Sequence, residues 1–408
     1  MRILVVSQYF WPESFRINEL VDSLTLRGIA VDVLTGKPNY PDGDIFKGYT
    51  AAGCSTEQWR NARVSRVPLF PRGRKSGLRL ALNYLSFVFS AGVFGPWLLR
   101  NARPDVILVY SPSPLLQALP ALLIGRLKRI PVVIYVQDLW PESLEATGYV
   151  RSRLVLAFIE RVVRFIYRRA RLILASSRPF VPAILRFRPP GPVVYYPNSV
   201  DESFGDPDAK LKPDVPSLDG DKFSVVFAGN VGSAQAVHVI VDAAQRLRDN
   251  GTIRLVVLGS GSELEWMKRE REARKLDNLD IAGRFPVESM PYLLSRASAL
   301  LVSLADRPIF AGTVPNKIQA YMAVGRPIIA CMNGEGARIV SEAQAGLTVP
   351  AEDPEGLANA ILKLWNMPPE ERELLGKNGR AYYREHFDHE KLVSKLINYL
   401  EEAIGKRQ

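Results

Sequence analysis

FAGNVGSAQ (residues 227–235) and GTVPNKIQAYMAVGRPI (residues 312–328) decide the fold of the C-terminal half. In the first stretch, the apolar run 224–227 predicts a buried strand, and the short loop 229–232 predicts a connection to a helix beginning near Gln235. Glycines let the backbone approach a ligand closely, and free N–H groups at a helix start favour an anion. The loop is therefore expected to hold a diphosphate.

The second stretch predicts one short helix with a cation at its start. Pro315 is typical of a first helical position, and Gly325 is typical of a helix end. Asn316 and Lys317 then fall on the first turn. Since the helix dipole disfavours a cation there, Lys317 indicates a nearby polyanion, the alternative being a surface lysine without a ligand.

The chain is long for one core and its charge is divided unevenly. With 408 residues, two domains are expected. Residues 1–200 carry 27 Lys and Arg against 12 Asp and Glu, whereas residues 201–408 carry 26 against 30. The basic half predicts an anionic partner, either a membrane surface, a phosphorylated substrate or nucleic acid.

Cysteine content and hydropathy predict a protein without disulfides or an export signal. Cys54 and Cys331 lie in different expected domains, which favours a reducing cytosol. Residues 78–99 approach the length of a membrane span but contain Arg79 and Asn83, so a buried helix is favoured.

Strand and helix patterns alternate twice along the chain. In residues 1–200 the expected strands are RILVVS, VDVLT, ARVSRVP, DVILVY and VVIYV, and this alternation indicates a parallel sheet covered on both faces. Residues 201–222 are rich in Pro, Asp and Gly and predict a linker. Residues 223–385 repeat the pattern, with expected strands FSVVFAG, RLVVLG, LDIAGRF, ALLVSLA, PIIAC and GLTVP. Residues 386–408 are expected to form a helix that packs back on the first domain. Two doubly wound α/β domains would bind ligands in a cleft at the carboxyl ends of their strands.

The motifs together resemble a known family. FAGNVGSAQ, the Gly-Arg-Phe after LDIA, KIQAYMAVGRPII, GEGARIV and AGLTVP resemble family-4 retaining glycosyltransferases of the GT-B fold. SQYFWPE, TGKPNYPDG and QDLWPES resemble the bacterial branch that builds O-antigen, capsule and colanic-acid-type polysaccharides. The resemblance implies a C-terminal domain that binds a nucleotide sugar, UDP-linked by family habit, and an N-terminal domain that binds the acceptor. It also implies no cofactor and no catalytic metal.

The chain departs from the family pattern at the diphosphate and ribose positions. Asn230 and Gln235 occupy places where most members carry Arg and Lys, so more of the charge neutralisation would depend on Lys317. Gly312 and Ala320 stand where most members carry two glutamates. Glu335 is a candidate replacement for the ribose-binding glutamate.

The expected donor site combines backbone N–H groups with cations. Such groups can stabilise the negative charge that develops on a departing diphosphate. Gly283, Arg284 and Phe285 follow a predicted strand and would offer backbone edges to a base, or would form a plain turn. The donor candidates are Gly229, Asn230, Val231, Gly232, Gly283, Arg284, Phe285, Arg307, Asn316, Lys317 and Glu335.

The expected acceptor site lies after the strand VVIYV. There Asp138, Trp140 and Glu142 form the mixture of acids and aromatics that binds sugar hydroxyls. Asp138 is the predicted orienter or base for the attacking hydroxyl, the alternative being that it caps the next turn. Tyr9, Glu13 and Asn39 are the other acceptor-side candidates.

No metal site is predicted. The two Asp-Gly-Asp sequences, at residues 42–44 and 219–221, fall in turn-like segments, and the three histidines lack the spacing of metal ligands. The first strand is also followed by no glycine-rich fingerprint, which disfavours a dinucleotide-dependent oxidoreductase.

Residues 151–188 contain ten arginines and one acid, Glu160, with apolar residues at helical spacing. Such a helix can lie in the headgroup layer of an anionic membrane, the alternative being a solvated helix face. With the resemblance, a lipid-diphosphate-linked saccharide at the inner face of the cytoplasmic membrane is the implied acceptor.

Two competing functions remain at this stage. A GT-B sugar-nucleotide epimerase would form product without an acceptor. A non-enzymatic nucleic-acid-binding protein would explain the basic half but not the glycine loops, and the sequence contains no recognisable nucleic-acid module.

Overall fold

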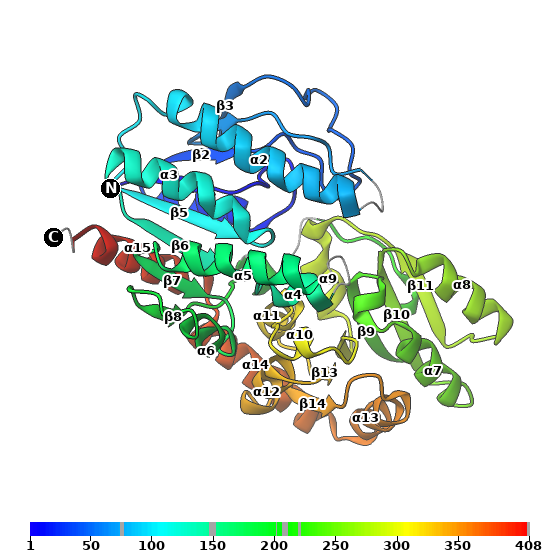
Figure 1. Ribbon diagram of the computed structural model, residues 1–408. Helices are drawn as coiled ribbons and strands as arrows, with labels where there is room; N and C mark the ends of the chain where they lie inside the picture. Colours follow the sequence, from blue (N-terminus) through cyan, green and yellow to red (C-terminus); the bar gives the residue numbers. More distant parts are fainter. Residues whose placement is uncertain (74–76, 147–151, 201, 206–210, 219–221, 406–408) are drawn as a thin grey trace. The chain divides into compact units, whose positions relative to one another are not determined.

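The computed structural model describes residues 1–73, 77–146, 152–200, 202–205, 211–218 and 222–405 (Figure 1). It divides into a first unit, Met1–Tyr196 with Glu390–Gln408, and a second unit, Pro197–His389. Three parts of the predicted linker (201, 206–210 and 219–221) and Arg151 of the basic stretch lie outside the described residues.

The first unit is built on an eight-stranded sheet in the order β3-β4-β2-β1-β5-β6-β7-β8. All neighbouring strands are parallel except β3 and β4, which pair antiparallel. The strands are β1 (Arg2–Val6), β2 (Ala30–Thr35), β3 (Ser55–Trp59), β4 (Ala62–Arg66), β5 (Val106–Ser111), β6 (Val132–Val136), β7 (Leu172–Ala175) and β8 (Val193–Tyr195).

Helices cover both faces of this sheet, as alternation along β1 requires. Leu4 and Val6 join the core beneath α2, α3, α5 and α6, whereas Ile3 and Val5 join the core beneath α1 and α15. The helices are α1 (Arg16–Leu26), α2 (Gly77–Leu98), η1 (Leu115–Gln117), α3 (Ala118–Lys128), α4 (Glu142–Ala146), α5 (Arg153–Tyr167), α6 (Phe180–Leu185) and α15 (His389–Gly405).

The second unit contains a six-stranded parallel sheet in the order β11-β10-β9-β12-β13-β14. Its strands are β9 (Phe223–Asn230), β10 (Ile253–Ser260), β11 (Leu279–Gly283), β12 (Ala299–Ser303), β13 (Ile328–Cys331) and β14 (Gly346–Val349). Val225 and Phe227 of β9 face one core, and Val226 and Ala228 face the other.

Helices again lie on both faces of the second sheet (Figure 1). They are η2 (Glu202–Gly205), η3 (Pro216–Leu218), η4 (Ser233–Gln235), α7 (His238–Arg246), α8 (Leu264–Ala273), η5 (Val287–Ser289), α9 (Met290–Ser295), α10 (Pro308–Ala311), α11 (Asn316–Val324), α12 (Glu335–Glu342), α13 (Pro354–Asn366) and α14 (Pro369–His386).

The predicted doubly wound fold is confirmed, with differences at element ends. The helix expected near Gln235 begins at His238 after the one-turn η4, and Pro315 is the N-cap of α11 instead of its first residue. Gly325 ends α11 in the left-handed conformation, with φ of +77°, as predicted.

Candidate functional site

The carboxyl end of β9 lies where the strand order of the second sheet reverses. β10 and β11 lie on one side of β9, and β12 to β14 lie on the other. Open α/β sheets bind ligands outside their strand ends at such a switch point. Gly229 occupies this end with φ of +133°, and a Cβ on the neighbouring Gly259 would lie 1.8 Å from the Gly229 carbonyl oxygen. The two glycines therefore permit a close approach of β9 and β10 at the site.

Lys317 is the cation at this strand end. Its Nζ lies 3.9 Å from the centroid of the Phe227 ring, and a Cβ on Gly229 would lie 3.3 Å from the same atom. The Nζ is buried and has no hydrogen-bond partner in the described part of the chain, although part of the side chain reaches solvent. Burial lowers the pKa of Lys317 to about 7. This amine lies beside a ring face and a glycine, and no acidic side chain in the described ranges is paired with it.

Tyr321 fixes the helix that carries Lys317. Its hydroxyl accepts a hydrogen bond from the Ala228 N–H at 3.0 Å and lies 3.4 Å from the Ala228 carbonyl oxygen. Residues four apart lie on the same side of a helix. The contact of Tyr321 with β9 therefore holds Lys317 over Phe227, one turn earlier.

Some polar groups in the loop after β9 already form hydrogen bonds within the protein. Asn230 donates from Nδ2 to Oε1 of Gln235 at 3.0 Å, so the two uncharged replacements pair with each other. The Val231 N–H donates to the Ser260 carbonyl at 2.9 Å, so this expected ligand donor is already engaged. The Gly232 N–H has no recorded acceptor among the described residues.

Glu335 begins α12 beside the α10–α11 connection. It is buried and receives two hydrogen bonds from Arg338, at 2.7 and 2.8 Å. A Cβ on Gly334 would lie 2.0 Å from the Ala311 carbonyl oxygen, so the start of α12 packs against the residue before Gly312. The first residues of α12 therefore lie close to the chain position where most family members carry a glutamate. Carboxylate oxygens accept more than one hydrogen bond each, so Glu335 keeps capacity for a ligand hydroxyl.

The other donor candidates lie at the rim of the second unit. Gly283 has φ of +82° and open space at its Cβ position, Arg284 is exposed, and Phe285 packs partly against the core. Arg307 is exposed at the N-cap of α10. Asn316 is exposed and accepts a hydrogen bond from Asn198 at 3.0 Å.

The first unit has its own switch point, between β1 and β5. Beside it, the Glu13 carboxylate accepts hydrogen bonds from the N–H groups of Phe10 at 3.2 Å, Asn39 at 2.8 Å and Tyr40 at 2.7 Å. Burial raises the pKa of Glu13 to about 7, although these N–H groups oppose the rise. Glu13 therefore ties the loop after β1 to the loop after β2.

The hydrogen bonds of Glu13 belong to a larger network of buried polar side chains at this edge of the sheet. Asn39 accepts from Nδ2 of Asn83 at 3.2 Å, and Asn83 accepts from Nε2 of Gln8 at 2.7 Å. The Gln8 N–H in turn donates to Oε1 of Gln117 at 2.7 Å. Asn39 is fully buried, so its polar groups hold loops together in this ligand-free protein.

Asp138 lies at the carboxyl end of β6 near Ser113 and Trp140. Burial raises its pKa to about 6, and hydrogen bonds from Ser143, the Leu139 N–H, Ser113 and Trp140 oppose the rise. The Trp140 indole donates to the Ser113 hydroxyl at 3.2 Å. Asp138 thus contacts the turn that follows it. Its raised pKa also suits proton transfer.

The remaining acceptor candidates are packed to different degrees. Trp140 is buried, with its ring 6.3 Å from that of Tyr84. Glu142 forms an ion pair with Arg186. Tyr9 is buried and stacks on Phe15 at 5.0 Å between ring centroids.

Sequence reasoning missed Arg72 and Tyr84, which lie among the acceptor candidates. The Arg72 guanidinium lies 5.2 Å from the centroid of the Tyr40 ring, and Tyr84 is buried close to Ser113 and Asp138. The only sequence signal for Tyr84 was a polar group inside an apolar helix. Arg72 belongs to a basic loop, PRGRKSG, whose arginines are indistinguishable by sequence. Within the described residues, no three His, Cys, Asp or Glu side chains lie close enough to hold a metal ion.

Comparisons with known proteins cover both units. Residues 14–199 match the family described as "Glycosyl transferase 4-like domain", and residues 222–367 match "Glycosyl transferases group 1". The probable glycosyltransferase WbjE of Pseudomonas aeruginosa is 27% identical over 348 residues, which cover 82% of this chain and 84% of the relative. The D-rhamnosyltransferase WbpZ of Pseudomonas aeruginosa is 26% identical over 320 residues, which cover 76% of each chain.

The fold also matches solved structures. Anabaena Alr3699/HepE in complex with UDP and glucose aligns with a TM-score of 0.69 at 16% identity, covering 98% of this chain and all of that one. At this identity the likeness concerns the fold.

Proposed function

The chain belongs to the glycosyltransferases of the GT-B fold, with a 4-like N-terminal domain and a group 1 C-terminal domain, and from this premise we propose its donor, acceptor and stereochemistry. It transfers a sugar, an N-acetylated one by family habit, from a UDP-linked donor to a lipid-diphosphate-linked saccharide. The transfer retains the anomeric configuration, uses no metal and serves bacterial surface polysaccharide synthesis. The second unit binds the donor and the first unit binds the acceptor.

The observation that carries this proposal is the unpartnered Lys317 amine at the carboxyl end of β9. A buried amine without a counter-ion is unfavourable unless a ligand supplies the charge. A diphosphate placed against Gly229 would pair with the Lys317 ammonium and accept from the Gly232 N–H. Together these groups would stabilise the charge that develops on the leaving diphosphate.

Glu335 and Asp138 are the proposed partners of the donor and the acceptor. Glu335, held by Arg338, would accept hydrogen bonds from the ribose of the nucleotide. Asp138 would orient the attacking hydroxyl of the acceptor and receive its proton. The solved complex of HepE with UDP supports a UDP donor by analogy of fold.

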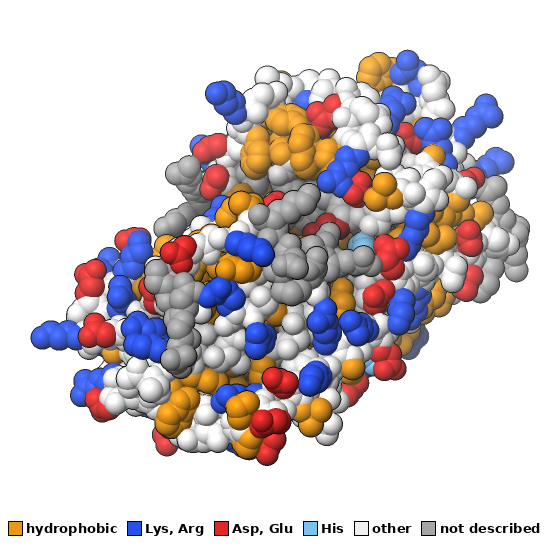
Figure 2. Space-filling view, turned by 180° about the vertical axis from the view of Figure 1, so that it is seen from behind, with side chains coloured by type: hydrophobic (Ala, Val, Ile, Leu, Met, Phe, Trp, Pro, Cys, Tyr) orange, Lys and Arg blue, Asp and Glu red, His pale blue; other side chains and the backbone are white. Residues whose placement is uncertain are grey.

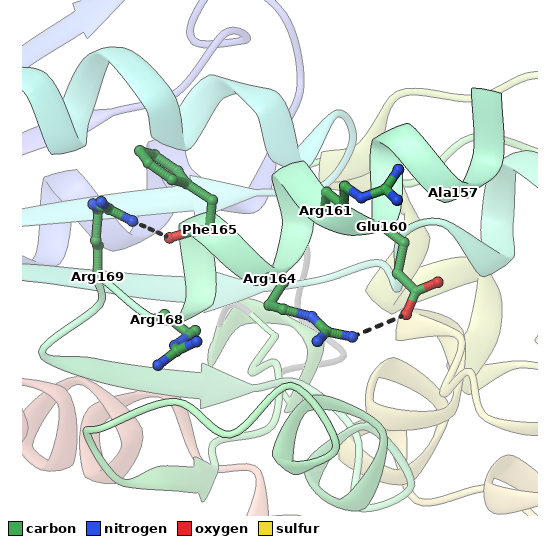
Figure 3. A pocket seen from close by; sticks show the side chains of 7 residues that line it. All are labelled: Ala157, Glu160, Arg161, Arg164, Phe165, Arg168 and Arg169. Atoms are coloured by element: carbon green, nitrogen blue, oxygen red, sulfur yellow. Dashed lines mark hydrogen bonds and ion pairs between the residues drawn. The ribbon is translucent and has the colours of Figure 1, made fainter. Parts of the chain in front are cut away.

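The partner of the first unit's basic surface is proposed to be an anionic membrane. Figure 3 shows Arg161 and Arg164 on α5 and Arg168 and Arg169 directly after it. Arg164 is paired to Glu160 at 3.5 Å, and Arg169 lies over the Phe165 ring. These side chains line an open hollow of about 920 Å³. Four cations around one carboxylate leave positive charge for phosphate headgroups.

Apolar side chains continue this basic surface onto α3 and α2. Arg126 and Leu123 of α3 line a second hollow with Phe165 and Arg168, and a Cβ on Gly92 of α2 would lie 3.9 Å from Leu123. Exposed apolar residues on α2 are Leu78, Leu82, Leu85, Phe89, Val93, Phe94 and Trp97. The helix α2 is long and apolar enough to cross a membrane by length and composition, yet its other side is in the core of the first unit.

Figure 2 shows the back of the view in Figure 1, where hydrophobic side chains gather in patches between charged ones, whereas α2, α3 and α5, which carry the arginines and exposed apolar residues named above, lie at the front in Figure 1. A surface that offers arginines beside exposed leucines and aromatics suits shallow insertion into a lipid headgroup layer. We therefore place the enzyme in the cytoplasm, peripheral to the inner face of the cytoplasmic membrane.

Isothermal titration with a panel of nucleoside diphosphates tests the donor proposal. UDP is expected to bind the wild-type protein more tightly than GDP, ADP or CDP, and Lys317→Ala is expected to weaken that binding. Radiolabelled UDP-sugar should give product only when a lipid-linked acceptor is added. Failure of UDP to bind, or product formed without an acceptor, would contradict the proposal.

A further inference from the structure

Arg72 is a partly buried cation without an acidic partner, in the loop after β4. Its N–H donates to Oδ1 of Asn39 at 3.1 Å, and the Gly73 N–H donates to the Gly43 carbonyl at 2.9 Å. Two hydrogen bonds therefore fix the backbone of this loop on the loop after β2. Among the described residues, no carboxylate lies within ion-pair distance of the Arg72 guanidinium.

Arg66, a few residues earlier, is an arginine of the same unit whose guanidinium is paired with protein groups. It is fully buried, donates to Glu57 at 2.7 Å and to the Gly36 carbonyl at 3.0 Å, and stacks on Tyr49. The fold therefore provides Arg66 with a carboxylate and carbonyl partners. Arg72 has aromatic rings in their place.

Three tyrosines surround the Arg72 guanidinium. It lies over the Tyr40 ring, and it is close enough to Tyr9 and Tyr84 to oppose the rise that burial causes in the pKa of each hydroxyl. The Tyr9 hydroxyl is buried and lies beside the Arg72 guanidinium and close to the Tyr84 hydroxyl. A cation and two buried tyrosine hydroxyls thus meet at one place, and no carboxylate among the described residues neutralises the cation.

The nearby carboxylates of Glu13 and Asp138 do not pair with Arg72. Glu13 receives three backbone N–H groups. Tyr84 lies near both Asp138 and Arg72, so the proposed base and the cation are neighbours of the same tyrosine. An anionic group bound at Arg72 would therefore be one tyrosine away from the hydroxyl that Asp138 orients.

We propose that Arg72, with the Tyr9 and Tyr84 hydroxyls, forms an oxyanion subsite of the first unit that binds a charged group of the acceptor. This proposal rests on the proposed function, because it assigns the first unit to the acceptor. The guanidinium fork would meet two oxygens of the anion, and the Tyr9 hydroxyl would donate to it. Two sources share this chemistry, the diphosphate of a lipid carrier and the carboxylate of an acidic sugar.

Titration calorimetry of the full-length Lys317→Ala protein in excess UDP tests the subsite, because the substitution weakens the donor site and UDP occupies what remains of it. Inorganic pyrophosphate and D-glucuronate are titrated separately. At least one should bind, and adding Arg72→Gln should weaken that binding about tenfold or more. Arg63→Gln, at the exposed position of β4, is the matched control and should leave binding unchanged. Tighter binding of pyrophosphate would identify the lipid diphosphate, and tighter binding of glucuronate would identify an acidic sugar.

Binding of neither anion, or equal binding after Arg72→Gln, would overturn the proposal. Thermal unfolding of each variant checks the fold, and Arg72→Lys serves if Arg72→Gln does not fold. It keeps the charge without the fork, so its affinity should still fall several-fold. The donor proposal fails separately, when UDP does not bind the wild-type protein, whatever the anion titrations give.

Discussion

The Nζ of Lys317 lies 3.9 Å from the centroid of the Phe227 ring and has no hydrogen-bond partner in the described residues. A ring face attracts a cation but cannot replace an anion at full strength. In the ligand-free protein, burial shifts the Lys317 equilibrium toward the neutral amine. The charge state of this residue should therefore depend on the donor.

Lys317→Ala should lower turnover far more than donor binding. The ammonium would act mainly on charge that develops as the diphosphate departs, and loss of such a group costs about 10²–10³-fold in kcat. UDP affinity should fall by less than about tenfold. Steady-state kinetics with UDP titrations measure both, and an unchanged kcat would remove Lys317 from the reaction.

UDP binding should weaken with rising pH through Lys317. Its pKa is about 7 in the empty protein, so above that pH the amine must gain a proton when the anion binds. Far above the pKa, this requirement costs about tenfold in affinity per pH unit. Titration calorimetry should therefore show proton uptake at about pH 8 in the wild type.

Lys317→Met is the control because it keeps an unbranched apolar stem without the amine. Its UDP affinity should lack this component of the pH dependence. Parallel affinity profiles for the wild type and Lys317→Met would show that the amine does not titrate on binding.

Glu13 should make the stability of the first unit fall as pH rises. Its folded pKa of about 7 lies above the value of about 4.3 in an unfolded chain, so the folded state holds more protons between these values. Stability is then lost progressively across that window. The stability advantage of wild type over Glu13→Gln should shrink from about pH 5 to about pH 8, measured by urea unfolding. Glu19→Gln on α1 is the control, and parallel curves for wild type and Glu13→Gln would refute the effect.

Asp138→Asn should lower kcat/KM by about 10²–10⁴-fold, the usual contribution of a positioned base. Because the pKa of Asp138 is raised to about 6, wild-type activity should fall as pH drops through 6. The Asn variant should lack this acid limb. Glu145→Gln on α4 is the nearby control. An acid limb that persists in Asp138→Asn would assign the limb to another group.

Vesicles of anionic lipid should bind the wild-type protein at physiological salt. Changing Arg164 of α5 and Arg168 at its C-cap to Glu should release the protein, because each arginine near such a surface contributes about 1 kcal/mol. Arg246→Glu with Arg248→Glu in the second unit is the matched control. Flotation measures the bound fraction, and a wild type that stays in the soluble fraction would exclude membrane association.

Periodicity predicted most strands because their faces are buried. All six strands of the second sheet appear among the expected ones, since each is an apolar run between turn signals. β3, β7 and β8 were missed. β3 is a polar edge strand whose residues STEQW pair only with β4, and β7 and β8 are short. Their pairing depends on tertiary contacts that local patterns do not encode.

The site was less predictable than the fold. The sequence indicated that Lys317 begins a helix and that Gly229 ends a strand, but Tyr321 determines their contact through Ala228. The sequence shows Asn230 and Gln235 as uncharged replacements for basic residues. Their hydrogen bond to each other is visible only in the folded structure. The tyrosines that surround Arg72 likewise become visible only in the fold.

The C-terminal helix α15 has a consequence for biosynthesis. Leu392, Val393, Leu396 and Leu400 complete the core beneath β1, and the Tyr196 hydroxyl donates to the Leu392 carbonyl at 2.8 Å. The ribosome therefore makes every residue of the second unit before the first can close. Until α15 has been translated, one apolar face of the nascent N-terminal sheet stays uncovered, and chaperones bind such apolar surfaces.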